Sequence, residues 1–159
     1  MKDVKKNILY LVIPCYNEEE VLPITTKKLT EKLDNMIKGK LVSKESRIMY
    51  VNDGSKDRTW ELIGQFNKTN KYVTGVNLSR NRGHQNALLA GLMTAKEYAD
   101  IVVSMDADLK DDIDGVDKIV VLKEGVVAEQ GKPQELKQQK GIYKHMVDMQ
   151  MQSNSWKYQ

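Results

Sequence analysis

The feature that most constrains this chain is the alternation of short apolar runs with segments of helical period over its first 112 residues. The apolar runs have the length and bulk expected of strands buried on both faces. They cover residues 8–13, 47–51, 73–78 and 101–105. Strands that alternate with helices predict an α/β fold, with a mainly parallel sheet and helices on both faces.

The boundaries of the helices can also be predicted. Asn17 precedes an acidic turn and is expected to cap the first helix, which Gly39 is placed to end. Ser55 or Asp57 is expected to cap the second helix. A third helix is predicted over residues 83–99, where apolar residues recur on one face.

Polar residues gather directly after each predicted strand. The four clusters are residues 14–18, 53–55, 79–83 and 106–108. Open parallel sheets bind ligands at the carboxyl ends of their strands. Because the four clusters follow four strands, we expect them to form a single binding site.

Length and composition exclude several classes of protein. A chain of 159 residues suffices for one domain with a single core. The net charge is only +3 and the basic residues are scattered, which argues against nucleic acid as a partner. A single cysteine, Cys15, excludes an internal disulfide and indicates a cytoplasmic environment. The apolar run before Pro14 is too short to span a membrane, so membrane contact is expected from the cytoplasmic side or through a part that this chain lacks.

The composition changes after residue 112. Residues 119–122 and 126–129 flank Lys123-Glu124-Gly125, which predicts a β-hairpin. A short helix is expected after Gly131-Lys132-Pro133, and an amphipathic helix over residues 142–151. We expect this hairpin and these helices to complete the fold, with the hairpin extending the edge of the sheet.

Asp106 and Asp108 follow a buried strand, two positions apart. Carboxylates so placed can share a hard cation, Mg²⁺ or Mn²⁺, which takes oxygen ligands and would neutralise a leaving diphosphate. The alternative is a solvated acidic turn.

Asp53 follows the second predicted strand. Its carboxylate can accept a hydrogen bond from the imide N–H of a base, and Gly54 allows the backbone a close approach. The alternative is an Asx-turn that caps the next helix. Arg80 and Arg82 lie before a helix start, which suits a phosphate, although an ordinary basic loop has the same composition.

Two other polar residues near these clusters are expected to have structural roles. His84 is interpreted as a surface or capping residue. Cys15 is interpreted as a packed thiol and not as a nucleophile.

Four segments together resemble the inverting family 2 nucleotide-sugar glycosyltransferases. They are VIPCYNEEE at 12–20, VNDGSKD at 51–57, LSRNRGHQNA at 78–87 and SMDADL at 104–109. The branch that they resemble most is the polyprenyl-phosphate glycosyltransferases, similar to dolichyl-phosphate mannose synthase and the bactoprenol glucosyltransferases. The resemblance covers about residues 5–114 and implies the N-terminal half of a GT-A fold, which binds the nucleotide sugar.

The resemblance also implies which residues bind the donor, a UDP-sugar or a GDP-sugar. The implied nucleotide-sugar residues are Pro14, Tyr16, Glu18, Asp53, Ser55, Arg80, Asn81, Gly83 and Asp106. Asp53 would accept from uracil or guanine, Asp106 would lie near the ribose and the metal, and Asp108 would ligate Mg²⁺ or Mn²⁺. In this family branch the acceptor is a lipid phosphate at the cytoplasmic face of a membrane. It is already largely dianionic near pH 7, so no strong general base is needed, and we assign no catalytic residue.

Residues 115–151 resemble a different family, the last segment of an ABC exporter ATPase domain. A phosphate-binding loop is missing from the sequence, because Gly125 and Gly131 are separated by five residues and Pro133 replaces the required Ser or Thr. The sequence therefore predicts a fusion. Residues 1–114 would be the donor-binding half of a glycosyltransferase, and residues 115–159 a hairpin with helices packed on it as one unit.

This interpretation has consequences for activity. The acceptor half would be absent, so transfer is doubtful, and surface left uncovered by its absence would favour a homodimer. The alternatives are a chimera without function and an ABC-type ATP-binding fragment.

Overall fold

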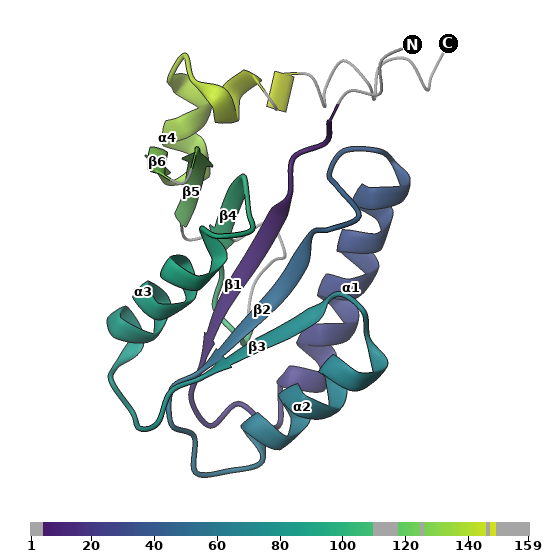
Figure 1. The fold of residues 1–159 in the computed structure, drawn as a ribbon, viewed down its shortest axis with the longest axis vertical. Coiled ribbons are helices and arrows are strands. Elements are labelled where there is room, and N and C mark those ends of the chain that lie inside the picture. The colour runs from purple at the N-terminus through teal and green to yellow at the C-terminus, as the bar shows by residue number, and fades with distance from the viewer. Residues whose placement is uncertain (1–4, 110–117, 125, 146, 149–159) are drawn as a thin grey trace.

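The computed structural model describes residues 5–109, 118–124, 126–145 and 147–148 as a six-stranded sheet with helices on both sides (Figure 1). The strand order is β3-β2-β1-β4-β5-β6. The elements are β1 (Leu9–Cys15), α1 (Leu22–Lys38), β2 (Arg47–Asn52), α2 (Thr59–Thr69), β3 (Val73–Asn77), α3 (His84–Ala95), β4 (Ile101–Ser104), β5 (Lys118–Lys123), β6 (Val126–Gly131) and α4 (Pro133–Gln138).

The first four strands form the parallel part of the sheet, as predicted. β1 lies between β2 and β4 and is parallel to both, and β2 is parallel to β3. All four carboxyl ends therefore reach the same edge, where the polar clusters follow them. The α/β prediction is confirmed, and so is the end of α1, which is followed by Gly39.

Both faces of β1 are buried because successive side chains point to opposite sides of a strand. Leu11 and Ile13 pack with residues of α1 and α2, whereas Tyr10 and Val12 pack on the side of α3. Figure 1 shows the same division, with α1 and α2 on one side of the sheet and α3 on the other. A continuous apolar run is what this double burial requires.

α3 approaches the sheet closely through small residues. Ala87, Gly91 and Ala95 are its buried positions. A Cβ added to Gly91 would lie 2.5 Å from Val12 Cγ1 and 2.7 Å from Val51 Cγ2, so only glycine fits without displacing these valines. α3 is shorter than the predicted helix 83–99, because a turn over residues 96–98 replaces its last part.

The C-terminal segment joins the same sheet. β5 is antiparallel to β4 and forms the predicted hairpin with β6, so the hairpin extends the sheet edge as expected. Ile119 and Val121 pack with Leu136 of α4, which is the predicted short helix. The predicted helix 142–151 lies partly outside the described residues, and residues 142–145 and 147–148 of it are helical.

The prediction that Asn17 caps α1 is wrong. α1 begins at Leu22 after Val21, which makes no side-chain capping bond. Asn17 instead has a left-handed backbone, with φ of 53°, and its Oδ1 accepts a hydrogen bond from Lys56 N at 2.8 Å. Its side chain therefore holds the loop after β2 and not the helix.

The residue that precedes α2 is Arg58, which makes no side-chain capping bond, so neither Ser55 nor Asp57 is the cap residue, although Asp57 bonds to the first turn. Asp57 Oδ1 accepts from Thr59 N at 2.9 Å, in the first turn of α2, whereas Ser55 Oγ accepts from Asn17 N at 3.0 Å. Among the described residues, none of the helices combines the length and the apolar character needed to cross a bilayer.

Candidate functional site

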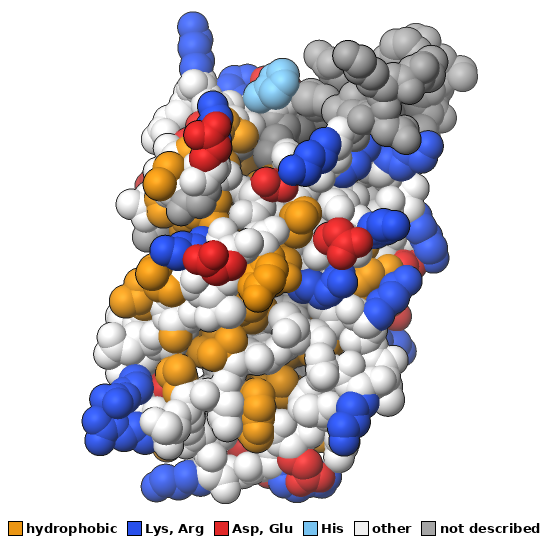
Figure 2. All heavy atoms as spheres, in the orientation of Figure 1, with side chains coloured by type: hydrophobic (Ala, Val, Ile, Leu, Met, Phe, Trp, Pro, Cys, Tyr) orange, Lys and Arg blue, Asp and Glu red, His pale blue; other side chains and the backbone are white. Residues whose placement is uncertain are grey.

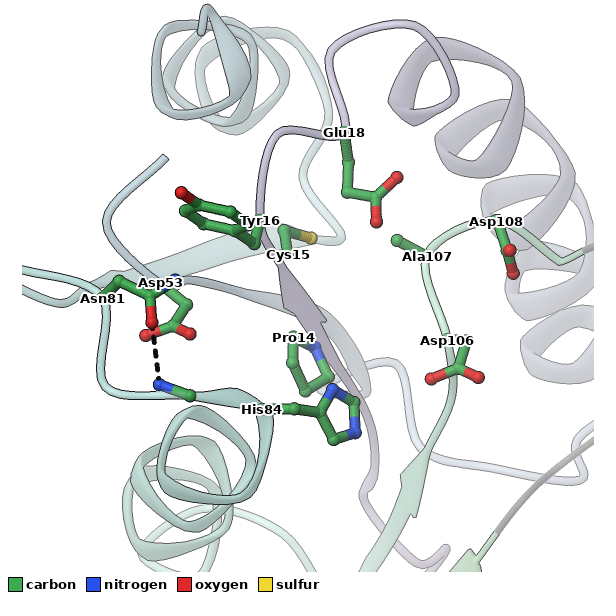
Figure 3. A pocket seen from close by; sticks show the side chains of 11 residues that line it. Pro14, Cys15, Tyr16, Glu18, Asp53, Asn81, His84, Asp106, Ala107 and Asp108 are labelled. Atoms are coloured by element: carbon green, nitrogen blue, oxygen red, sulfur yellow. Dashed lines mark hydrogen bonds between the residues drawn. The ribbon is translucent and has the colours of Figure 1, made fainter. Parts of the chain in front are cut away.

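A cavity of about 290 Å³ lies at the carboxyl edge of the parallel strands (Figure 3). The loops after β1, β2 and β4 and the start of α3 form its walls. The lining residues are Pro14, Cys15, Tyr16, Glu18, Asp53, Asn81, Gly83, His84, Asp106, Ala107 and Asp108. All four polar clusters of the sequence contribute to this lining.

Most of the residues predicted for the site are brought together here. Eight of them line the cavity, namely Pro14, Tyr16, Glu18, Asp53, Asn81, Gly83, Asp106 and Asp108. Ser55 and Arg80 are not part of the lining. Ser55 is half-buried and supports the backbone of Asn17, and Arg80 is exposed beside Asn81.

Asp53 joins two loops of the cavity wall. Its side chain is only 3% exposed, and its Oδ1 accepts a hydrogen bond from Arg82 N at 2.6 Å. Gly54 next to it has a φ of +67°, and a Cβ there would lie 2.3 Å from Asn81 N. The loop after β2 and the loop before α3 therefore touch through their backbones, which only glycine permits.

The loop before α3 is also held from within. Gly83 N donates to Asn81 Oδ1 at 3.1 Å, the bond drawn as a dashed line in Figure 3. Gly83 has a φ of +88° and precedes the first turn of α3. The N–H groups of such a turn are without helical partners, which suits an anion.

The loops after β1 and β2 are joined by hydrogen bonds from backbone N–H groups to side chains. Glu18 N donates to Thr59 Oγ1 at 2.8 Å, and Glu19 N donates to Asp57 Oδ2 at 3.1 Å. Burial by itself would raise the pKa of Asp57, but bonds from Thr59 and from the N–H of Glu19 together hold it below its usual value. These contacts fix the loop that carries Tyr16 and Glu18.

Asp106 and Asp108 line the cavity, and they alternate along the chain with two residues that are buried in the core. Met105 and Ala107 point into the core and are 4% and 3% exposed, whereas the two aspartates line the cavity. Two carboxylates on one wall suit a hard cation. The described residues hold no group of three or more His, Cys, Asp or Glu side chains arranged to bind a metal, so such an ion would need further oxygen ligands from phosphate or water.

His84 is exposed, as the sequence interpretation of a surface residue expects, but its place in the cavity lining was not predicted. It is the first residue of α3, and in Figure 3 its ring points into the cavity toward Asp106. Its position just after the cluster 79–83 was the available signal. Cys15 also lines the cavity, but it is 1% exposed and burial raises the pKa of its thiol. A protonated, packed thiol agrees with the sequence interpretation.

Comparison with known proteins identifies relatives of this arrangement. The sequence model described as "Glycosyl transferase family 2" matches residues 10–124, which include β5. The chain is 55% identical over 106 residues to the uncharacterized glycosyltransferase YkoT of Bacillus subtilis, covering 67% of this chain and 32% of YkoT. It is 36% identical over 110 residues to the prophage bactoprenol glucosyl transferase homolog of Escherichia coli, covering 69% and 33%.

A third relative matches a longer segment. An undecaprenyl-phosphate 4-deoxy-4-formamido-L-arabinose transferase of Pectobacterium carotovorum is 34% identical over 121 residues, covering 76% of this chain and 34% of the relative. The chain thus spans about a third of the length of the curated relatives that it matches. The comparisons provide no evidence for the predicted ABC-type origin of the C-terminal segment.

Solved structures support the fold. The mannosyltransferase PcManGT of Pyrobaculum calidifontis, in complex with GDP-Man and Mn²⁺, has a TM-score of 0.51 and 26% identity, covering 66% of this chain and 28% of that one. TarS 1–349 of S. aureus in complex with UDP has a TM-score of 0.51 and 20% identity, covering 64% and 27%. The structural neighbours have the GT-A fold, as the sequence predicted. The family match over residues 10–124 shows that this chain belongs to glycosyl transferase family 2.

Proposed function

We propose that the cavity binds a nucleoside diphosphate sugar together with Mg²⁺ or Mn²⁺. The observation that carries this proposal is the meeting of Asp53, Gly83, Asp106 and Asp108 in one cavity, although they follow three different strands. These groups offer a base acceptor, helix N–H groups and metal ligands in one place. The GDP-Man and Mn²⁺ complex of PcManGT, which has a related fold, is consistent with a site that binds a nucleotide sugar together with a metal ion.

The nucleoside would lie against the wall formed by Pro14, Tyr16 and Glu18. Asp53 Oδ1 already accepts from Arg82 N, and its second oxygen would accept the imide N–H of uracil. We propose UDP as the preferred nucleotide and GDP as the alternative. Ser55 would act through the backbone of Asn17, whose loop it supports.

The diphosphate would lie between the start of α3 and the two aspartates. Asn81 and Gly83 would line the approach to the backbone N–H groups of the first turn of α3, and Arg80 would approach from the exposed side of the loop. Asp106 and Asp108 would hold the cation, which supplies charge neutralisation for the leaving diphosphate when bound. His84 faces Asp106 across the cavity and would be near the same phosphates.

The acceptor is proposed from the relatives. Two of them are named for bactoprenol and undecaprenyl phosphate, so we propose a lipid phosphate at the cytoplasmic face of a membrane. A phosphate acceptor is largely dianionic near pH 7 and attacks without a strong base. The matched region is about a third of the relatives' length. We therefore propose donor binding for the residues described here, and we propose transfer to the acceptor only for proteins with the full length of these relatives.

The C-terminal segment and the oligomeric state belong to the same proposal. We keep the boundary between residues 1–114 and 115–159 as a proposed fusion point, with both parts sharing one sheet. We also propose a homodimer, because Leu89 and Met93 on α3 are 55% and 51% exposed. Figure 2 shows hydrophobic side chains on the side of the molecule where α3 lies, and no single concentrated patch of Lys and Arg on the face in view.

Calorimetric titration tests the proposed function. UDP should bind with higher affinity when Mn²⁺ is present, and Asp108→Ala should abolish the effect of Mn²⁺. Glu97→Ala is the matched control, since it removes an exposed carboxylate away from the cavity and should leave binding unchanged.

The other ligands separate the alternatives. Preference for GDP over UDP would reassign the base. Binding of ATP in preference to both would favour an ABC-type fragment, and binding of no nucleotide would favour a chimera without function.

A further inference from the structure

A buried hydrogen bond connects α1 to the wall that carries the two aspartates. Thr25 Oγ1 donates to the carbonyl of Ala107 at 2.6 Å, and the two residues lie 82 positions apart. We infer that Thr25 is a positioning residue for Asp106 and Asp108, setting the geometry on which metal-dependent nucleotide binding depends. The part of this inference that concerns ligand binding rests on the proposed function.

The hydroxyl of Thr25 does not bond within its own helix, as the hydroxyls of Thr69 and Thr94 do. A threonine within a helix commonly returns its hydroxyl to the carbonyl four residues earlier. Thr69 does so with Gln65 at 3.1 Å, and Thr94 with Ala90 at 2.9 Å. Thr25 instead directs its hydroxyl out of the helix, although its own backbone N–H makes the usual bond to Val21 at 3.0 Å. The backbone hydrogen bond of Thr25 within α1 forms without the hydroxyl. The hydroxyl is therefore available to hold the segment of residues 105–109, which we call the Ala107 turn.

The Ala107 turn, residues 105–109, depends on such a contact. It enters from β4 with Met105 N bonded to Val12 O at 3.1 Å, and it leaves with Leu109 at a φ of +40°, a conformation that side chains disfavour. Between these ends, Ala107 is 3% exposed. Without Thr25, the buried Ala107 carbonyl would lose the partner that it has in the structure.

The position of the bond explains why it bears on the site. The carbonyl of Ala107 belongs to the peptide that leads into Asp108, and Asp106 directly precedes Ala107. A rotation of that peptide would therefore move both carboxylates relative to each other. Ligands of a metal have to be held to within about 0.5 Å by their supporting shell, so a small rotation is enough to weaken binding.

Thr26 provides a matched control one residue further along the same helix. It is 4% exposed against 2% for Thr25, and its Oγ1 is 2.7 Å from Tyr50 OH. Valine in place of either threonine keeps the shape and removes one buried hydrogen bond. The two variants should therefore lose similar stability, and they differ in whether the lost bond reaches the Ala107 turn.

The test compares Thr25→Val, Thr25→Ser and Thr26→Val with the unmodified chain. Two properties are measured, hydrogen exchange of the peptide covering residues 105–109 without ligand and UDP affinity with Mn²⁺. Thr25→Val should exchange faster in this peptide and bind UDP with Mn²⁺ about tenfold more weakly, in the range seen when support of a metal ligand is removed. Thr25→Ser should restore both properties, and Thr26→Val should change neither.

Several results would overturn the inference. If Thr25→Val has the same hydrogen exchange and the same UDP affinity as the unmodified chain, the hydroxyl of Thr25 does not position Asp106 and Asp108. Equal loss of affinity in Thr25→Val and Thr26→Val would reduce the effect to general stability. If the unmodified chain binds no nucleotide, the proposed function is wrong. Exchange then decides the structural part alone: faster exchange in Thr25→Val supports control of the turn, and unchanged exchange overturns it.

Discussion

The close packing of α3 on the sheet leads to a quantitative prediction about two helical glycines. Gly91 in α3 and Gly64 in α2 would each gain about 1 kcal/mol of helix propensity on substitution by alanine. Around Gly64 a new Cβ would meet nothing within 4 Å, whereas at Gly91 it would lie 2.5 and 2.7 Å from two valine methyl groups. The same change thus adds a methyl group to open space in one helix and to a filled interface in the other.

The expected magnitudes follow from these distances. Gly64→Ala should raise the free energy of unfolding by about 1 kcal/mol. Gly91→Ala has the same gain, but forcing a methyl group into a packed interface costs about 1–3 kcal/mol, and branched Val12 and Val51 cannot rotate away easily. The two variants should therefore differ by about 1–3 kcal/mol, with Gly91→Ala the less stable, and propensity cancels from this difference.

Urea unfolding followed by circular dichroism measures the difference. With a slope of about 2 kcal/mol/M, the midpoints of the two variants should lie about 0.5–1.5 M apart. Adding Val12→Ala to Gly91→Ala should remove much of the clash, which a double-mutant cycle detects as favourable coupling. A Gly91→Ala midpoint equal to or above that of Gly64→Ala would refute the packing argument.

Three further predictions follow from other contacts. The lowered pKa of Asp57 means that its contribution to stability is present above the ordinary value of 3.8 and is lost as pH falls below it, so Asp57→Asn should flatten the fall of melting temperature measured from pH 6 to pH 3. Tyr50→Phe leaves the buried hydroxyl of Thr26 without its partner and should cost about 1–2 kcal/mol in urea unfolding. Sedimentation should show a dimer that Leu89→Lys with Met93→Lys converts to a monomer, and a monomer at every concentration would contradict the proposed interface.

Much of the fold could be predicted because its signals are local. The run at 8–13 is apolar at every position, which matches the double burial of β1, and the small residues of α3 repeat at helical spacing. The edge that holds the site also followed from chain order, because parallel strands share one carboxyl edge. The hairpin of β5 and β6 was visible in its own pattern, and its antiparallel pairing with β4 followed the expectation that it extends the sheet.

What could not be predicted depends on contacts between distant segments. Asparagine is a common residue at helix caps, but the Oδ1 of Asn17 accepts from the backbone N–H of Lys56, 39 positions away. His84 is exposed as predicted, but its place opposite Asp106 could not be predicted, because the two residues face each other only after β4 has paired beside β1. The bond from Thr25 to Ala107 likewise exists only in the folded chain.

In the loop after β1, the side chains that fix the path of the backbone are not the ones that line the cavity. The path of that loop is held mostly by side chains of its neighbour, Ser55, Asp57 and Thr59, which accept from its backbone N–H groups. Every residue except proline supplies such an N–H, whatever its side chain. Tyr16, whose side chain is 42% exposed, is therefore open to replacement without a change in the path of the loop. Under the proposed function, selection for a different donor would act on this position while Ser55, Asp57 and Thr59 stay as they are, so recognition at this wall of the cavity would change faster than the loop that carries it.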